Sequence, residues 1–405
     1  MLRNSRQGLL TMCILVVTAA SAYYASSHPM DFRVYYYGAR GVFDGTRPVY
    51  GLTSGLGWPM HYRYPPLFLL LFAPFAMLPL GWGAGAWVVL KVVTLVGLVG
   101  WVKKKDLPNP ATFAFIPVLF VTPYVIEEFR YGNAQFFVFA LTAASLLIAR
   151  QRPILSAASL ALGISIKVWP LFFILYLVAR RDWKVAAYAL CFVVLLALLP
   201  SFYFGFQGNA GLLGQWFAQE SQTQLGESEI WFPNQSLRGV LMRYLTVIDY
   251  SQVPDSNYPL VNVASLDPAT VRLIWILLAG VAYAVLLLIA ARRRNTEGWF
   301  EHGLAFCMLA LLEPFTQKYA LAVLLWPALA ARFLTDRPRV RILIYAATIL
   351  ALIQPLVPGS AAQRLLQVLG LDFAATALLT VVMVIASSSE FTIPLSRRGP
   401  AESYK

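Results

Sequence analysis

Long apolar segments alternate with short polar ones along almost the whole chain. The stretch 185–205, VAAYALCFVVLLALLPSFYFG, contains no charged residue, and a helix that crosses a bilayer needs about 17–25 apolar residues. The ten-residue alternation typical of an outer-membrane barrel is missing from the sequence, so these segments are predicted to be helices, which satisfy their own backbone groups in lipid. The pattern predicts an all-α polytopic membrane protein.

The candidate spans share low charge and a length of roughly one helix each. They are 8–25, 66–80, 83–102, 110–126, 133–149, 154–166, 169–179, 185–205, 271–291, 300–313, 318–334, 340–357 and 372–388. Arg3 and Arg6 precede the first span, which places the N-terminus in the cytoplasm. The alternative for this segment is a cleaved signal peptide, because AYYASS resembles a cleavage site.

Composition sharpens this prediction. The 405 residues are 59% hydrophobic and 13% charged, against roughly 45–50% and about 25% in soluble domains, which excludes a soluble enzyme, a disordered chain and a secreted disulfide scaffold. The net charge is +13, but most Lys and Arg stand in short clusters between apolar segments, which indicates cytoplasmic loops and not nucleic-acid binding. The three cysteines lie in apolar runs and show neither a disulfide framework nor metal-ligand spacing.

The basic clusters decide how the chain threads the membrane. All of them face the cytoplasm only if 154–179 is two short helices broken at 167–170, and if 66–102 crosses once with the proline-rich 66–80 at the outer surface. This predicts one integral-membrane domain, 1–405, with about twelve transmembrane helices. A rival threading, also with about twelve crossings, places 103–105 and the pair Arg150 and Arg152 outside.

The favoured threading also defines three polar segments. They are a first outer loop at 26–82, a large outer loop at 206–270 and a C-terminal tail at 389–405.

The first outer loop carries the strongest candidate chemistry. Asp31 follows the first span by a few residues and stands near Tyr35. An isolated carboxylate there can act as general base for an acceptor hydroxyl, or it can be the N-cap of a helix over 32–43. Tyr62, Arg63 and Tyr64 close the loop with one cation and two phenols, for which an interfacial aromatic anchor is the alternative.

Several cations reach the outer side against the positive-inside bias and need a reason, such as an anionic ligand. Lys167 lies at a predicted helix break, where a lipid phosphate would need a cation, and Lys318 lies in a second break. A snorkelling lysine is the alternative for both. Arg130 is either a phosphate ligand or the partner of the neighbouring acids, and Lys91 in mid-span is expected to face the bundle interior.

A resemblance follows from motifs in this order along the chain. They are Asp31-Phe32-x-Val34-Tyr35-Tyr36, Tyr64-Pro65-Pro66-Leu67, Gly132-Asn133-Ala134-Gln135, Lys167-Val168-Trp169-Pro170 and Asn234-Gln235-Ser236. Together they resemble glycosyltransferase family 87, whose members are membrane transferases of the GT-C fold that use polyprenyl-phosphate sugars. The resemblance covers most of the chain. It departs at 313–319, where relatives carry Ser-Pro-x-Ser-Trp and a histidine but this chain has Gln317 and Lys318.

The resemblance implies roles for individual residues. Asp31 would be the catalytic base, and the donor phosphate would be bound by Lys167, Lys318, Arg63 and Arg130. The substrates would contact a set of phenols and amides: Tyr35, Tyr62, Tyr64, Asn133, Gln135, Asn234, Gln235 and Gln317. Glu313 is the alternative base. No cofactor and no metal are implied.

The expected function is an inverting transfer of a sugar, with mannose favoured, from a polyprenyl phosphate to a lipid or glycan hydroxyl at the outer face of the cell membrane. Neither an Asp-x-Asp motif nor a glycine-rich phosphate loop occurs, so a nucleotide-sugar donor is unsupported. The rival is a secondary transporter or lipid flippase whose substrate site lies at the broken helices. A glycan polymerase or other lipid-modifying transferase is the third alternative.

Overall fold

The computed structural model describes residues 2–51, 60–103, 113–223, 231–247 and 259–388, and within these ranges all regular structure is helical. The helices before the large outer loop are α1 (Leu2–Ser27), α2 (Met30–Phe43), α3 (Pro66–Ala76), α4 (Leu80–Lys103), α5 (Ile116–Tyr131), α6 (Gln135–Ile148), α7 (Pro153–Ile166), η1 (Trp169–Leu171), α8 (Phe172–Ala179) and α9 (Trp183–Leu198). The remaining ones are α10 (Ser201–Thr223), α11 (Leu237–Leu245), α12 (Pro268–Arg292), α13 (Trp299–Leu312), η4 (Lys318–Leu324), α14 (Leu325–Ala331), α15 (Pro338–Leu356), α16 (Ser360–Val368) and α17 (Leu371–Ser388).

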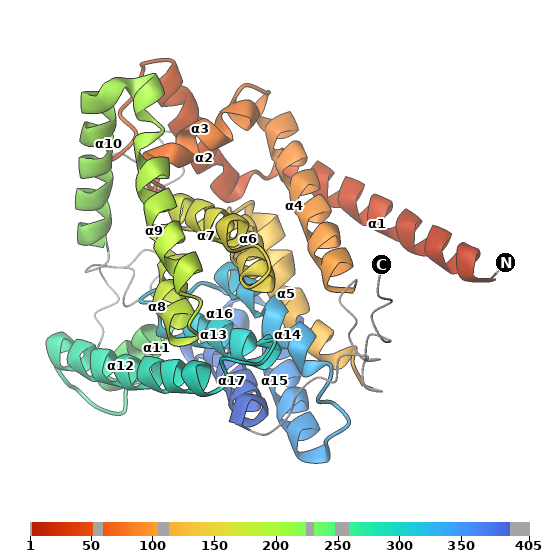
Figure 1. Cartoon of the computed structure of the whole chain (residues 1–405). Helices are drawn as coiled ribbons and strands as arrows, with labels where there is room; N and C mark the ends of the chain where they lie inside the picture. The colour runs from red at the N-terminus through yellow and green to blue at the C-terminus, as the bar shows by residue number, and fades with distance from the viewer. Residues whose placement is uncertain (1, 52–59, 104–112, 224–230, 248–258, 389–405) are drawn as a thin grey trace, which may run out of the picture.

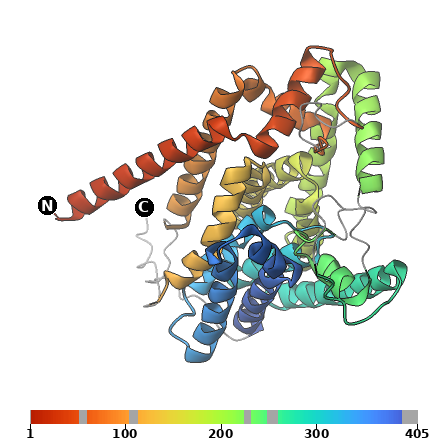
Figure 2. The same ribbon diagram turned by 180° about the vertical axis from the view of Figure 1, so that it is seen from behind.

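The helices divide into three groups in space. Helices α1–α4 lie at one end of the molecule, α12–α17 lie at the other, and α5–α9 connect them (Figure 1). The reverse view shows the same order, with α1 extending away from the body (Figure 2). Helices α6, α7 and α9 pack in succession, and α5 packs against η4. The middle group therefore links the first outer loop to the C-terminal bundle.

Local sequence explains where several helices begin. Proline occupies the first turn of α3, α7, α12 and α15, where its missing N–H removes no helical hydrogen bond. Asp267 caps α12 by accepting from the backbone N–H of Thr270 at 3.0 Å, and Ser236 caps α11 through Gly239.

Among the described residues, four helical segments are long and apolar enough to cross a membrane, namely Leu80–Val102, Pro268–Arg292, Pro338–Leu356 and Leu371–Ser388. The bent pair α9 and α10 brings the number to five if it counts as one span. Other apolar helices are shorter, and α6, α7 and α13 have 14 residues each. The number of about twelve spans is therefore not confirmed, although the apolar outward face of α12 fits contact with lipid.

The two predicted breaks around 66–102 and 154–179 are present. Helix α7 ends at Ile166, Lys167 is extended, and η1 follows before α8. Helix α3 is a separate short element before α4. The predicted span 185–205 is wrong at its end, because α9 stops at Leu198 and α10 departs from it at 95° beyond Pro200. A proline at this point cannot continue the helical hydrogen bonds.

The predicted tail 389–405, residues 104–105 and parts of the large outer loop lie outside the described residues. The structure has helix α11 within that loop and helix α10 across its start, and the sequence pattern predicted neither. The sidedness of the loops stays a prediction.

An aromatic cluster anchors α2 to α3 and α4. Phe32 and Tyr35 of α2 lie within 5.1–6.4 Å, between ring centroids, of Phe72 and Trp87. All four side chains are buried. Edge-on contacts of this kind add to the area that the rings bury, so the start of α2 is held firmly where it meets the turn between α5 and α6.

Candidate functional site

Asp31 is buried in the first turn of α2. The helix begins at Met30, its N-cap is Pro29, and no side chain makes a cap hydrogen bond there. The Asp31 carboxylate instead accepts a hydrogen bond from Nδ2 of Asn133 at 2.8 Å. The capping alternative is therefore wrong, and the carboxylate is directed at a residue 102 positions away in the chain.

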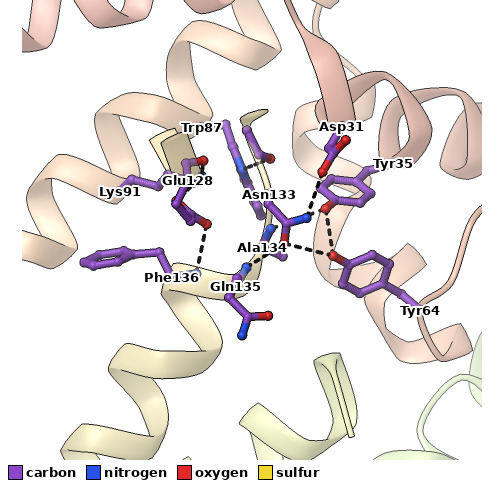
Figure 3. A network of polar contacts seen from close by, with 11 residues as sticks. Asp31, Tyr35, Tyr64, Trp87, Lys91, Glu128, Asn133, Ala134, Gln135 and Phe136 are labelled. Atoms are coloured by element: carbon purple, nitrogen blue, oxygen red, sulfur yellow. Dashed lines mark hydrogen bonds and ion pairs between the residues drawn. The ribbon is translucent and has the colours of Figure 1, made fainter. Parts of the chain in front are cut away.

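Asn133 is presented by the turn between α5 and α6 (Figure 3). Helix α5 ends at Tyr131, and its C-cap is Gly132, whose φ is 69°, the left-handed conformation that glycine adopts most easily. A Cβ on Gly132 would also lie 3.2 Å from Cβ of Phe32. Glycine thus lets the turn approach α2 closely enough for Asn133 to reach Asp31.

A directed chain of hydrogen bonds orients the Asn133 amide. Its Oδ1 accepts from Tyr64 Oη at 3.3 Å and from the backbone N–H of Gln135 at 2.9 Å. Tyr35 and Tyr64 share a hydrogen bond of 2.7 Å between their hydroxyl groups. Because Tyr64 donates its single proton to Asn133, Tyr35 must donate to Tyr64. The amide oxygen is occupied, so its NH₂ group faces Asp31, and Asp31 must accept.

Lys167 joins the same site through the other end of the turn. Its Nζ donates to Oε1 of Gln135 at 2.8 Å, and the indole of Trp169 donates to the same oxygen at 3.1 Å. The ammonium also lies 5.8 Å from the ring centroid of Tyr319. The structure therefore brings together six of the residues predicted from sequence, with Lys167 at one edge. The other five members of this network are Asp31, Tyr35, Tyr64, Asn133 and Gln135.

Burial sets the protonation behaviour of this site. It raises the pKa of Asp31 to about 6, while the Asn133 hydrogen bond and the charge of Lys167 act in the opposite direction. Burial lowers the pKa of Lys167, against the attraction of Glu313. A carboxyl with a pKa near 6 is mostly ionised at neutral pH and is a stronger base than an exposed aspartate. The Asp31 carboxylate can therefore remove a proton, and the Lys167 ammonium can bind an anion on the other side of the turn.

Tyr62 lies in the same aromatic cluster but outside the hydrogen-bond chain. Its ring centroid is 5.8 Å from that of Tyr64, and its hydroxyl is buried with no hydrogen-bond partner. Tyr62 and Tyr64 are 3% and 5% exposed. Both are packed inside the protein, which does not fit the interfacial-anchor alternative.

The other predicted cations have partners of their own. Arg63 donates twice to the Glu220 carboxylate of α10, at 3.1 and 2.9 Å, and Arg130 pairs with Glu127 at 2.8 Å. Lys318 donates to Oε1 of Gln354 on α15. Their assignment to a donor phosphate stays a prediction.

Three predicted amides lie at the segment between α13 and η4. Asn234 accepts from the backbone N–H of Thr316 at 3.1 Å and donates to the Pro314 carbonyl at 3.0 Å. The Gln235 backbone N–H donates to the Thr316 carbonyl at 2.7 Å. Gln317 is buried at the N-cap of η4. These contacts tie the large outer loop to this segment, and a contact with substrate remains a prediction.

Two further groups lie near Lys167, and sequence reasoning missed one of them, Tyr319. Burial raises the pKa of Glu313 to about 7, and the charge of Lys167 lowers it; Tyr319 lies beneath the ammonium. Glu313 appeared only as the alternative base. A carboxylate beside a helix-breaking proline, three residues before a buried threonine, was the available signal. Tyr319 gave none, because an aromatic residue after a break is common at membrane surfaces.

The fold and the site define a class: a helical membrane protein in which a buried aspartate and a lysine from different segments both contact one interhelical turn. The family model of glycosyltransferase family 87 matches residues 62–314. Since this is more than half of the chain, the protein belongs to glycosyltransferase family 87.

Two curated mycobacterial proteins are similar to the chain. Both are called polyprenol-phosphate-mannose-dependent alpha-(1-2)-phosphatidylinositol mannoside mannosyltransferase. The one from Mycobacterium tuberculosis is 30% identical over 223 residues, which is 49% of this chain and 52% of the relative. The one from Mycolicibacterium smegmatis is 30% identical over 174 residues, 38% of this chain and 39% of the relative. The chain thus spans about half the length, or less, of these relatives. No solved structure matches significantly.

Proposed function

We propose that this protein is an inverting glycosyltransferase that moves a sugar from a polyprenyl phosphate to a hydroxyl of a lipid or glycan. The observation that carries the proposal is the network that joins Asp31 to Lys167 through Asn133 and Gln135. It supports a proposal in which Asp31 removes a proton and Lys167 binds a phosphate, because both side chains contact residues of a single turn, Asn133 and Gln135.

Asp31 is the base of this reaction. It takes the proton of the acceptor hydroxyl while that oxygen forms a bond to the anomeric carbon of the sugar. The bond from this carbon to the phosphate oxygen breaks in the same displacement, so the configuration inverts. Polyprenyl phosphate leaves as an anion, and no protein acid has to protonate it. The Asn133 amide holds the carboxylate in place through the 2.8 Å hydrogen bond.

Lys167 is the cation for the donor phosphate. It is favoured over Arg63 and Arg130, because these are paired with carboxylates whereas Lys167 donates to a neutral amide. It is favoured over Lys318, because its partner Gln135 belongs to the turn that carries Asn133, whereas the partner of Lys318 lies on α15. A positive charge held at the leaving group stabilises the charge that grows there in the transition state. The other three cations remain secondary candidates.

Mannose is the proposed sugar, because both similar proteins are named for a polyprenol-phosphate-mannose donor. A phosphatidylinositol mannoside is the acceptor in those names, so a glycolipid hydroxyl is the first acceptor to test. The basic clusters favour a site at the outer face of the cell membrane. The proposal includes one membrane domain over the whole chain.

Sidedness is tested by cysteine labelling in a cysteine-free background. Asp44→Cys and Asn295→Cys both replace exposed residues, one near the end of α2 and one after α12. An impermeant thiol reagent should label position 44 in intact cells and position 295 only after permeabilisation. The reverse pattern would place the site on the cytoplasmic side.

The activity is tested with purified protein in proteoliposomes that contain radiolabelled polyprenyl-phosphate mannose and a phosphatidylinositol mannoside. Transfer of label to the acceptor, with inverted configuration by product analysis, supports the proposal. Movement of the donor lipid across the bilayer without a new glycosidic bond would instead support a flippase and refute the transferase.

A further inference from the structure

Lys91 and Glu128 form an ion pair inside the helical bundle, between α4 and α5. The Nζ and Oε2 atoms are 2.7 Å apart and both side chains are fully buried. The same Nζ donates to the backbone carbonyl of Glu128 at 3.0 Å. A buried ion pair is weak evidence for stability, because removing two charges from water offsets most of their attraction. The role of the pair is therefore better judged from the segment that it holds in place than from its contribution to stability.

The pair ends on the turn that carries Asn133. The second carboxylate oxygen of Glu128 accepts from the backbone N–H of Phe136 at 2.9 Å, at the start of α6. One helical turn before Lys91, the indole of Trp87 donates to the Gly132 carbonyl at 2.9 Å. Both ends of 132–136 are thus hydrogen-bonded to α4 or to the end of α5.

The opposite side of this turn faces the site. Figure 3 shows Lys91 and Glu128 on one side of Asn133, and Asp31 with its tyrosine partners on the other. Asn133 and Gln135 reach Asp31 and Lys167 at 2.8 Å each. A displacement of about 1 Å at such a site can reduce a rate by about 10²-fold.

We infer that Lys91 and Glu128 are positioning residues, which fix the turn 132–136 and thereby hold Asn133 against Asp31. The inference rests on the proposed function only in that it takes Asp31 to be the base. Lys91 touches no reacting atom, and its effect passes through the turn.

The charges around Asp31 allow this effect to be separated from simple electrostatics. The ionisable groups that act on Asp31 or respond to it are Lys91, Glu128, Lys167, Tyr35, Tyr64, Tyr131 and Tyr319. Lys91 lowers the pKa of Asp31 more than Glu128 raises it, so neutralising both would raise this pKa by charge alone, whereas a change at Trp87 leaves every charge in place. The hydrogen bond from Asn133 also lowers this pKa. A displaced Asn133 that no longer donates this hydrogen bond should therefore raise the pKa of Asp31.

The experiment is carboxyl labelling of the purified full-length protein with dicyclohexylcarbodiimide, which reacts with protonated buried carboxyls. Mass spectrometry then follows labelling of Asp31 against pH, with no need for transfer activity. The wild-type midpoint should lie near 6. Asn133→Ala should raise it by about one pH unit.

The double variant Lys91→Met/Glu128→Gln keeps the side-chain volumes and an oxygen for the N–H of Phe136. It should raise the midpoint in the same direction as Asn133→Ala and, in the transfer assay, lower kcat by about 10²-fold. Trp87→Phe removes the bond to Gly132 but keeps an aromatic ring against Phe32 and Tyr35, and it should give a smaller upward shift. Ser156→Ala is the control: it removes a buried hydrogen bond of 2.9 Å to Ser145, between α6 and α7, and should leave the midpoint unchanged.

An unchanged midpoint in both the double variant and Trp87→Phe would overturn the inference. If the double variant does not fold, Glu128→Gln decides: loss of its charge alone would lower the midpoint, whereas a looser turn would raise it, so an unchanged or lower midpoint would overturn the inference. Failure of the wild-type protein to transfer sugar would refute the proposed function but not the labelling result.

Discussion

Two lysines stand at two helix breaks, and the structure gives them different surroundings. Lys167 follows α7 in extended conformation and donates to Gln135, which belongs to the turn that also orients Asn133. Lys318 begins η4 and donates to Gln354 on α15, within electrostatic range of Asp372 at the start of α17. The same local sequence signal therefore marks a site in one case and a contact between C-terminal helices in the other.

The comparison shows that a helix break leaves a lysine side chain free to reach another element, but that the packing of the helices decides which residue the lysine contacts. At Lys167 the break faces α6, whose first residue carries the receiving amide. At Lys318 the succeeding residue, Tyr319, is directed toward Lys167, while Lys318 itself is directed toward α15. Two adjacent residues of η4, Lys318 and Tyr319, therefore contact different parts of the protein.

The largest difference is expected between Lys167→Ala and Lys318→Ala. Loss of a charge-assisted hydrogen bond to the donor phosphate costs roughly 1.5–3 kcal/mol, so Lys167→Ala should lower transfer by about 10- to 100-fold. Lys167→Arg, which keeps the charge, should lose less. Kinetics at varied donor concentration measure both. Equal losses for the two alanine variants would remove the distinction drawn between the two breaks.

Much of the site could be predicted from sequence because its residues occur in short ordered motifs. Asp31, Asn133, Gln135 and Lys167 were all candidates, and the break at 167–170 followed from the charge pattern. The partner of Lys91 could not be predicted from sequence. Glu128 lies 37 positions further along the chain, and its contact with Lys91 depends on how α4 packs on α5.

The number of transmembrane helices could not be predicted from the sequence either. Apolar composition fixes which segments avoid water, but not whether a helix of 14 residues such as α13 crosses the bilayer or packs inside the protein. The bend after α9 shows the same limit, since proline ends a helix without fixing the direction of the next one.

The pH profile should distinguish the Asp31 region from the Lys318 region. Asp31 acts as base only when ionised, and its pKa is raised to about 6 by burial. Turnover should thus fall as the pH drops through about 6, roughly tenfold for each further unit. Asn133→Ala should move this limb to higher pH, because the lost hydrogen bond favoured the carboxylate. Lys318→Ala should leave the limb in place. If Lys318→Ala instead shifted the pH at which turnover falls, the base would be coupled to the C-terminal helices.

The smallest effect on transfer is expected for Gln354→Leu, which removes the acceptor of the Lys318 hydrogen bond. An ammonium left without this partner should destabilise the fold by about 1–3 kcal/mol while turnover per folded molecule stays close to that of wild type. Thermal unfolding in detergent and the transfer assay, measured on the same preparation, test this. A large loss of turnover with unchanged Tm would assign Lys318 to the donor site after all.

The most direct test of the account is transfer by Asp31→Asn, beside Asp372→Asn as a second buried aspartate. Asparagine keeps the size of the side chain but cannot take a proton, so donor binding should survive while turnover falls by about 10²- to 10⁴-fold. Asp372→Asn should retain substantial turnover. Near-normal transfer by a folded Asp31→Asn protein, together with loss of transfer in Glu313→Gln, would show that Glu313 is the base and contradict the account.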